Sequence, residues 1–271
     1  MSMFDLTHKV AIVTGSLGLL GKEHCLALLG NGATVVVADL DGAAARNLAG
    51  ELAERFGGRA VGLGVDVGNR ASVVEMTREV LARFDRVDVL VNNAAVDDKV
   101  ESPELVLEQS RFENYPLESW ERLMRVNLTG AFLCAQSIAP AMVRRGSGSI
   151  INVASTYGIV APNQDLYLDQ QGQQRFFKSP AYPVSKAGLL HLTRYLAAYY
   201  GRSGVRANSL SPGGVANGQN ADFQAEYASR VPLGRMANKA DYRGALVFLA
   251  SDESAYMTGA NLVVDGGWTA W

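Results

Sequence analysis

The stretch Lys9-Val-Ala-Ile-Val-Thr-Gly-Ser-Leu-Gly-Leu-Leu-Gly21 decides the fold of this chain. Its first part, Lys9–Thr14, is a short apolar run rich in β-branched residues, which is typical of a buried parallel strand. The glycines that follow allow a sharp turn, and a helical pattern of apolar residues begins behind them. Backbone N–H groups and the positive end of the helix dipole meet at such a turn, so the stretch predicts a pyrophosphate site. An ordinary tight turn is the alternative.

A second apolar run, Ala33–Asp39, follows at the distance expected of a β-α-β unit. It ends on Asp39, where a carboxylate would accept hydrogen bonds from the ribose hydroxyls of a dinucleotide. The same charge would repel a 2′-phosphate. No cation that could reverse this effect is found among the neighbours Ser16, Leu17, Leu40 and Asp41. The sequence therefore predicts a dinucleotide site that prefers NAD to NADP.

Composition limits the classes of partner. The chain has 271 residues, of which 48% are hydrophobic and 19% charged, enough to bury one large core. A net charge of −2 gives no electrostatic reason to expect nucleic acid or an anionic membrane as a partner. The apolar stretches are short and interrupted, and the start Met1–Leu6 lacks the regions of a signal peptide. We expect a cytoplasmic protein.

Neither the cysteines nor the histidines form a pattern that points to a metal or a disulfide. Cys25 and Cys134 lie in apolar helical patterns and are interpreted as reduced core residues. His8, His24 and His191 are scattered and match no ligand spacing. No metal site is expected.

Apolar β-branched runs alternate with helical patterns along the whole chain. The expected strands lie at 9–14, 33–38, 87–91, 149–154, 205–210 and 261–264, with a weaker one near 60–65. The expected helices lie near 18–30, 42–56, 69–84, 118–145, 180–202 and 239–251. This alternation predicts a single doubly wound α/β domain of Rossmann type over residues 1–271. Its central parallel sheet would have about seven strands and helices on both faces.

Three connections after expected strands are unusually long: 92–117, 155–179 and 211–238. In such folds, ligands bind beyond the carboxyl ends of the strands. Loops of this length tend to be functional, so the three segments are expected to form the substrate site as integral parts of the domain.

Tyr182 and Lys186 lie four positions apart and share one face of the expected helix 180–202. A neighbouring ammonium favours the phenolate, so a tyrosine whose ordinary pKa is ~10 can act as a base. Two surface helix residues are the alternative for this pair taken alone. Its meaning depends on the other motifs, among them Ser155 at the end of an expected strand.

Together and in order, these motifs resemble the short-chain dehydrogenase/reductase family, in its compact single-domain type, over essentially the whole chain. The segments that carry the resemblance are Thr14–Gly21, Asp66-Val67, Asn92–Ala95, Val126–Leu128, Ser155, Tyr182, Lys186, Ser211–Val215 and Thr258–Gly267. The resemblance implies hydride transfer between NAD and a secondary alcohol or ketone.

The resemblance also implies four catalytic residues. Ser155 would hydrogen-bond the substrate oxygen while Tyr182 takes or gives its proton. Lys186 would lower the pKa of Tyr182 and contact the nicotinamide ribose, and Asn127 would hold a water that links the lysine to solvent. A structural amide inside a helix is the alternative for Asn127.

For the cofactor, the resemblance places Asp66 at the adenine, Asn92 beside the adenosine ribose and the backbone of Val215 at the carboxamide. The full expected set is Gly15, Ser16, Gly18, Leu19, Leu20, Gly21, Asp39, Leu40, Asp66, Val67, Asn93, Ala94, Ala95, Tyr182, Lys186, Pro212, Gly213 and Val215.

The chain departs from the family pattern in the cofactor turn, which reads G-x-x-G-x-x-G instead of G-x-x-x-G-x-G. The observed spacing is typical of extended members that modify nucleotide sugars. A sugar-nucleotide epimerase or dehydratase with retained NAD is therefore an alternative, and a non-catalytic NAD(H)-sensing protein is another.

In addition, Asn217 stands where many members have a threonine that bonds the cofactor.

A second departure is an insertion. Tyr182 follows Ser155 by 27 positions, against roughly a dozen in most relatives. The extra segment, 162–178, is polar and aromatic. Its glutamines could bind substrate hydroxyls, and Arg175 could pair with a substrate carboxylate or phosphate. A solvated loop is the alternative.

The segments Tyr157–Pro162, Ser211–Gln219 and Asp265–Trp271 resemble a branch of the family associated with bacterial surface-sugar and flagellin modification. That resemblance implies a polar, polyhydroxylated substrate. Trp268 and Trp271 are large for an exposed terminus, so they are expected to pack near a substrate loop or a neighbouring subunit. With family habit, this predicts a homotetramer or homodimer.

Overall fold

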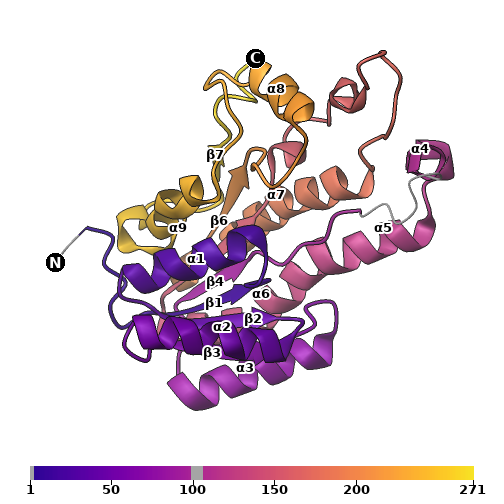
Figure 1. Cartoon of the computed structure of the whole chain (residues 1–271). Helices are drawn as coiled ribbons and strands as arrows, with labels where there is room; N and C mark the ends of the chain where they lie inside the picture. The colour runs from indigo at the N-terminus through magenta and orange to yellow at the C-terminus, as the bar shows by residue number, and fades with distance from the viewer. Residues whose placement is uncertain (1–2, 99–105) are drawn as a thin grey trace.

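A seven-stranded parallel sheet forms the centre of the computed structural model, which describes residues 3–98 and 106–271 (Figure 1). The strand order is β3-β2-β1-β4-β5-β6-β7, and every neighbouring pair is parallel. The strands are β1 (Val10–Thr14), β2 (Thr34–Asp39), β3 (Ala60–Gly64), β4 (Val89–Asn92), β5 (Gly148–Val153), β6 (Val205–Pro212) and β7 (Asn261–Val264). The order reverses between β1 and β4, and ligands bind at such a switch point. The predicted doubly wound α/β fold is confirmed.

Helices cover both faces of the sheet. One layer contains α1 (Leu19–Gly30), α2 (Gly42–Arg55) and α9 (Arg243–Ala250), whose apolar residues share one core cluster. The other contains α3 (Arg70–Phe84), α6 (Gly130–Arg145) and α7 (Ala181–Tyr200). The remaining helices are α4 (Val106–Ser110), α5 (Leu117–Met124) and α8 (Ala221–Ser229).

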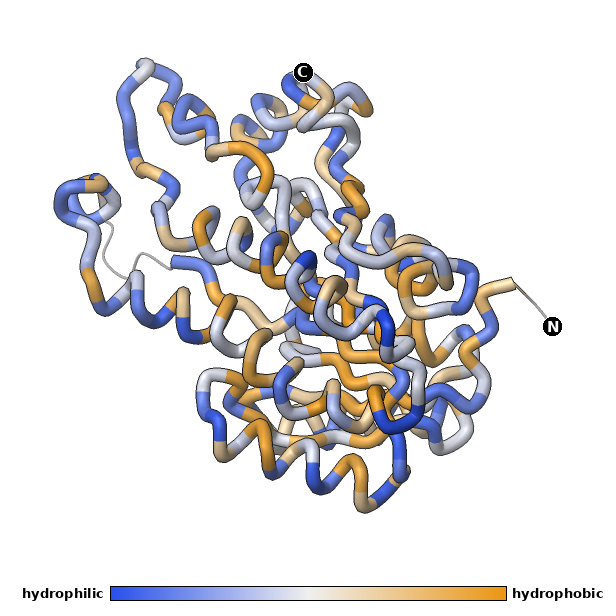
Figure 2. The backbone as a smooth tube through the Cα atoms, turned by 180° about the vertical axis from the view of Figure 1, so that it is seen from behind, coloured by the Kyte–Doolittle hydropathy of each residue, from blue (hydrophilic) through white to orange (hydrophobic). Residues whose placement is uncertain are grey.

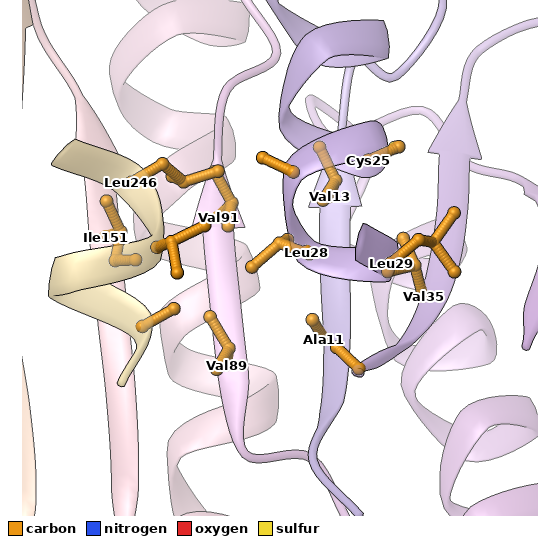
Figure 3. Packing of buried hydrophobic residues seen from close by; sticks show 14 of the residues in the cluster. Ala11, Val13, Cys25, Leu28, Leu29, Val35, Val89, Val91, Ile151 and Leu246 are labelled. Carbon is orange, nitrogen blue, oxygen red and sulfur yellow. The ribbon is translucent and has the colours of Figure 1, made fainter. Parts of the chain in front are cut away.

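The alternation of side chains along each strand explains the two cores. Val13 packs with Leu28 of α1 in one cluster, whereas its neighbour Ile12 packs with Ile138 of α6 in the other. Figure 3 shows Leu28 and Leu29 of α1 lying over β1, β2 and β4. Both leucines are fully buried, and burial of such a side chain stabilises the fold by ~1.5–3 kcal/mol.

Side chains cap the N-termini of α2 and α3. Asp41 caps α2 by accepting hydrogen bonds from the backbone N–H groups of Ala43 and Ala44, both at 3.0 Å. Asn69 caps α3 in the same way. Cys25 and Cys134 are free and buried, as predicted, and burial raises the pKa of each thiol to about 12.

The structure confirms the helix expected over 118–145 and places it at Leu117–Arg145, with one irregular turn inside it. A π-helical turn, Arg125–Thr129, separates α5 from α6. π-helical turns are rare in proteins overall, but those that occur lie frequently at functional sites. Leu117–Arg145 is also long and apolar enough to cross a membrane by length and composition, but half of its apolar window is buried inside the protein. The burial identifies it as a core helix.

The three long connections carry structure of their own. The first contains α4, and its residues 99–105 lie outside the described part of the chain. The second contains two short 3₁₀ turns and an isolated bridge between Leu168 and Gln174, and the third contains α8. Figure 2 shows the connection before α7 as a largely hydrophilic tube that extends away from the hydrophobic sheet.

Candidate active site

A cavity of about 820 Å³ opens beyond the carboxyl ends of the central strands. Residues that follow β1, β4, β5 and β6 line it, for example Gly15, Asn93, Ser155 and Pro212. Each of the three long connections contributes to its wall. Most of the predicted cofactor and catalytic residues therefore converge in this cavity, which lies at the end of the sheet where the strand order reverses.

The glycine turn forms one end of the cavity. Gly15 has a φ of +65°, and a Cβ atom there would lie 2.6 Å from the Cα atom of Ala94. A Cβ atom at Gly21 would collide with the carbonyl oxygen of Gly15, so this glycine lets α1 approach the turn. Gly18 caps α1, and Leu19 and Leu20 of its first turn line the cavity.

This end of the cavity fits a pyrophosphate. The first turn of α1 carries no acidic residue, and the absence of side chains at the glycines leaves the backbone open to an anion. Gly21 itself does not line the cavity; its contribution is the close packing of helix and turn.

The structure places Ser16 differently from the prediction, which assigns it to the cofactor. Its side chain is fully buried and does not line the cavity. The hydroxyl donates to the carbonyl of Val13 at 2.6 Å and accepts from the N–H of Ala38 at 3.1 Å. The backbone N–H of Ser16 also donates to the carbonyl of Ala38. The hydroxyl and the N–H of Ser16 therefore both connect the end of β1 to β2.

Two carboxylates line the adenosine end. Asp39 follows β2 and accepts hydrogen bonds from the backbone N–H groups of Leu17 and Leu40, each at 2.8 Å. Asp66 follows β3, accepts from the N–H of Gly68 at 2.9 Å and lines the cavity. Leu40 and Val67, also predicted, line the cavity beside them.

The two neighbouring asparagines after β4 have different positions. Asn93 lines the cavity and donates to the carbonyls of Thr14 and Gly15, both at 2.9 Å, which holds the glycine turn in place. Asn92, expected beside the adenosine ribose, is buried and does not line the cavity. Its amide donates to Asn152 on the neighbouring strand at 2.8 Å. Strand alternation points the two side chains in opposite directions.

Ser155 and Tyr182 meet despite the insertion between them. Ser155 follows β5 and Tyr182 lies in the first turn of α7, and the Ser155 hydroxyl is close enough to act on the pKa of Tyr182 in the lowering direction. Both line the cavity. The turn Gln164–Tyr167 of the insertion contacts α8, and Tyr167 and Lys178 of the insertion line the same cavity as Ser155 and Tyr182.

Lys186 is buried one turn further along α7. Its ammonium donates to the carbonyl of Val153 at 2.8 Å and lies 5.6 Å from the centre of the Tyr182 ring. Burial lowers the pKa of Lys186 to about 8. Burial, followed by the charge of Asp97, raises the pKa of Tyr182, which differs from the lowering predicted from Lys186 alone. Desolvation outweighs the lowering effect of the Ser155 hydroxyl at the floor of this cavity.

Asn127 lies in the π-helical turn, buried and outside the cavity wall. Its side chain accepts from the N–H of Val96 at 2.8 Å and donates to the carbonyl of Val96 at 2.9 Å. The amide also donates to Ser185, the neighbour of Lys186, at 3.2 Å. The π-turn thus directs one amide at both the β4 connection and α7.

The remaining predicted residues are found where expected. Asp39 and the glycine turn line one end of the cavity, and Tyr182 and Lys186 line the other. Residues that follow β4 and β6 line the cavity between these ends. The predicted lining residues not yet described are Ala94, Ala95, Gly213 and Val215.

Aromatic side chains form the wall opposite the glycine turn. Tyr157 and Tyr167 are hydrogen-bonded to each other, and Tyr227 accepts from the N–H of Gly214 at 2.6 Å. Trp268 stacks on Tyr227 at 4.5 Å, which confirms its expected packing near a substrate loop, whereas Trp271 is 81% exposed.

The sequence did not single out two charged residues of this wall, Asp97 and Lys178. They form an ion pair across the cavity, between the connection after β4 and the end of the insertion. The available signal was the position of Lys178 between the catalytic serine and tyrosine. Arg175, which was singled out, is exposed and pairs with Asp169 outside the cavity. Among the described residues, no cluster of potential metal ligands is present.

Comparisons with known proteins agree with this geometry. A family model described as enoyl-(acyl carrier protein) reductase matches residues 20–269. A trans-4-hydroxycyclohexanecarboxylate dehydrogenase of Sinomonas cyclohexanicum is 35% identical over 98% of this chain and 94% of its own length. A D-threitol dehydrogenase of Mycolicibacterium smegmatis is 34% identical over 98% of this chain and 95% of its own.

The fold also matches a solved structure. The gluconate 5-dehydrogenase of Burkholderia cenocepacia, crystallised with NADP and tartrate, is 31% identical with a TM-score of 0.86, covering 99% of this chain and 98% of its own. These relatives do not favour the epimerase, dehydratase or sensor alternatives. The chain belongs to the short-chain dehydrogenase/reductase family and is a nicotinamide-dependent oxidoreductase that acts on a CH–OH group.

Proposed function

We propose that the enzyme oxidises a secondary alcohol of a sugar or polyol derivative to a ketone, with Ser155, Tyr182 and Lys186 at the reacting oxygen. The observation that carries this proposal is that the Ser155 and Tyr182 side chains line the same cavity, with the Lys186 ammonium buried 5.6 Å from the centre of the Tyr182 ring. When bound, the nicotinamide accepts the hydride from the alcohol carbon or returns it.

Each residue has a defined task. The Ser155 hydroxyl orients the substrate oxygen by a hydrogen bond, and the Tyr182 phenol exchanges its proton with that oxygen. Lys186 supplies a positive charge beside the phenol and lies within reach of the ribose side of the cavity. Asn127 holds Val96 and Ser185 in place, so it positions the wall of the site and the helix that carries Lys186.

The first test is spectrophotometric. Purified enzyme is mixed with NAD⁺ or NADP⁺ and a panel of sugars, polyols, sugar acids and simple secondary alcohols, and absorbance is followed at 340 nm. Reduction of the cofactor by a polyhydroxylated compound supports the proposal. Oxidation confined to simple aliphatic alcohols contradicts the substrate class.

We further propose that NAD is the preferred cofactor and that Asp39 sets this preference. The carboxylate lies at the end of β2 on the cavity wall, where it faces the adenosine end of a bound dinucleotide. Of the described residues that line the cavity, Lys178 and Lys186 are the cations, and both lie at the opposite end. No lining cation near Asp39 would therefore compensate a 2′-phosphate.

Replacing Asp39 by Ser is expected to weaken NAD⁺ binding and to narrow its advantage over NADP⁺ by about tenfold or more, because a hydrogen bond to a charged group contributes roughly 1.5–3 kcal/mol and ~1.4 kcal/mol is a factor of ten. The measurement is the ratio of kcat/KM for the two cofactors at a saturating alcohol. Asp41→Ser, at the exposed cap of α2, is the matched control. A ratio that does not move in Asp39→Ser would show that this carboxylate is not at the ribose.

The residues on the substrate side of the cavity fit a cyclic or linear substrate with several hydroxyl groups. Tyr157, Tyr167 and Tyr227 offer both apolar ring faces and hydroxyls, and Asn217 and Gln219 add amides to the same wall. D-threitol dehydrogenase is one of the relatives, and its named substrate is a polyol. The same chemistry fits the resemblance to a branch that modifies bacterial surface sugars and flagellin.

We also propose that residues 1–271 form a single domain whose long connections belong to it, and that the enzyme works in the cytoplasm as a homotetramer or homodimer. Exposed apolar side chains on the outer helices support association: Phe132 on α6, and Tyr195 and Tyr199, which stack on each other, on α7. Light scattering coupled to gel filtration is expected to give a mass of two or four chains. A mass of one chain would contradict association.

A further inference from the structure

The ion pair between Asp97 and Lys178 has a position that the proposed chemistry does not use. Lys178 closes the insertion and Asp97 follows β4, so the pair joins two connections across the mouth of the cavity. The Lys178 ammonium lies 4.8 Å from the centre of the Tyr182 ring. It is therefore next to the phenol that would exchange a proton with the substrate.

The insertion holds Lys178 by its backbone. The Gln164 side chain accepts from the N–H of Lys178 at 2.8 Å and donates to the carbonyl of Lys178 at 3.2 Å. Gln174 in turn donates to the carbonyl of Gln164 at 3.0 Å. One amide thus satisfies both backbone groups of a loop residue, which fixes where its side chain starts. The lysine side chain is 13% exposed and the Asp97 side chain 45%.

The charges of the cavity wall are balanced at this end. Among the described lining residues, Asp97 and Lys178 neutralise each other, and Lys186 is engaged with Val153 beneath Tyr182. Arg175 is paired with Asp169 outside the cavity. A substrate carboxylate that approached this pair would meet the Asp97 charge, and the other lining cation among the described residues, Lys186, is buried beneath Tyr182. A hydroxyl, in contrast, can donate to Asp97 and accept from Lys178 at once.

We propose that the Asp97–Lys178 pair is a specificity determinant that binds neighbouring hydroxyls of the substrate and selects neutral polyols over hydroxy acids. This inference rests on the proposed function and names its substrate class more closely. The relatives include enzymes named for both kinds of substrate, a polyol and a carboxylate. The charge balance of this chain's own wall favours the first.

The test compares matched substrates. Polyols of four, five and six carbons are each paired with the aldonate that differs by a terminal carboxylate, and kcat/KM is measured at pH 7.5 and constant ionic strength. The wild type is expected to prefer the polyol by at least about tenfold. Preference for the acids would overturn this inference and leave the proposed oxidoreductase intact. If no polyol and no acid is oxidised with either cofactor, the proposed substrate class fails and this inference with it.

Two variants separate the charges. Asp97→Asn leaves the Lys178 ammonium without its carboxylate, so the acid-to-polyol ratio of kcat/KM is expected to rise at least about tenfold. Lys178→Met is expected to raise KM for polyols about tenfold or more with a smaller change in kcat. NADH binding, measured by fluorescence, reports whether each variant is folded.

The matched controls are Asp169→Asn and Arg175→Met, which remove the exposed ion pair of the same insertion. Both controls are expected to keep the wild-type selectivity. If Asp97→Asn leaves the ratio unchanged, or if the controls move it equally, the pair does not select the substrate and the inference is overturned.

Discussion

Tyr182→Phe is expected to lower kcat at least ~100-fold while NADH binding stays nearly unchanged. The substitution removes only the hydroxyl that lies with Ser155 in the cavity wall and exchanges the substrate proton, and a positioned proton transfer contributes typically ~10²–10⁴ in rate. The ring remains to fill the cavity floor. Steady-state kinetics give kcat, and fluorescence titration gives the NADH affinity.

The pKa shifts of Tyr182 and Lys186 describe the protonation state of the site before substrate binds. Burial raises the pKa of Tyr182 and lowers that of Lys186 to about 8, so the unliganded site holds a neutral phenol beside a lysine that has lost about half of its proton at pH 8. Tyr256→Phe, on the exposed surface, is the matched control. Unchanged turnover in Tyr182→Phe would remove Tyr182 from its role.

Acidification from pH 6.5 to 4 is expected to cost the fold roughly 3 kcal/mol through one histidine, His24. Its side chain on α1 is fully buried, and neither ring nitrogen has a hydrogen-bond partner. Burial lowers its pKa from 6.5 to about 4, although the charge of Glu23 acts in the opposite direction. A difference of about 2.5 units corresponds to roughly 3 kcal/mol at 1.36 kcal/mol per unit.

The direction follows from which state binds the proton. Above pH 6.5 the imidazole is neutral in both the folded and the unfolded state. Proton binding therefore takes nothing from the free energy of unfolding in this range. Between pH 6.5 and 4 the unfolded chain binds a proton that the folded protein does not, so stability falls with pH; below 4 both states are protonated and the loss is complete.

Denaturant unfolding of His24→Leu across this pH range measures the effect. The variant is expected to be at least as stable as the wild type at pH 7, because an unpartnered buried N–H is removed, and to lose roughly 3 kcal/mol less on acidification. His191→Leu, at an exposed position of α7, is the matched control. Parallel pH curves for wild type and His24→Leu would contradict the assignment.

The sequence alone was sufficient for the fold and for the position of the cofactor turn. Lys9–Thr14 and Ala33–Asp39 are apolar runs rich in β-branched residues, which is typical of a parallel strand buried on both faces. Tyr182 and Lys186 were found because helical spacing is local: residues four apart meet whatever the rest of the chain does.

Longer-range relations were less accessible. Ser16 and Asn92 stand inside recognisable motifs, yet the structure turns both side chains into hydrogen bonds within the sheet. The helix expected over 118–145 contains a π-helical turn at Arg125–Thr129 that was not predicted, and Asn127 in this turn bonds Val96, which is distant in sequence. Apolar periodicity gives no sign of such a bond, since the π-turn preserves the apolar face on either side.

Charge partners were the least accessible of all. Arg175 and Lys178 lie in the same insertion and have the same formal charge, but one pairs with Asp169 at the surface and the other with Asp97 inside the cavity. Local patterns of β-branched and helical residues determine the strands, the helices and the end of the sheet where ligands bind. Which side chains meet there depends on how loops far apart in the chain pack together, because Coulomb and hydrogen-bond energies depend on distances that only the folded chain sets.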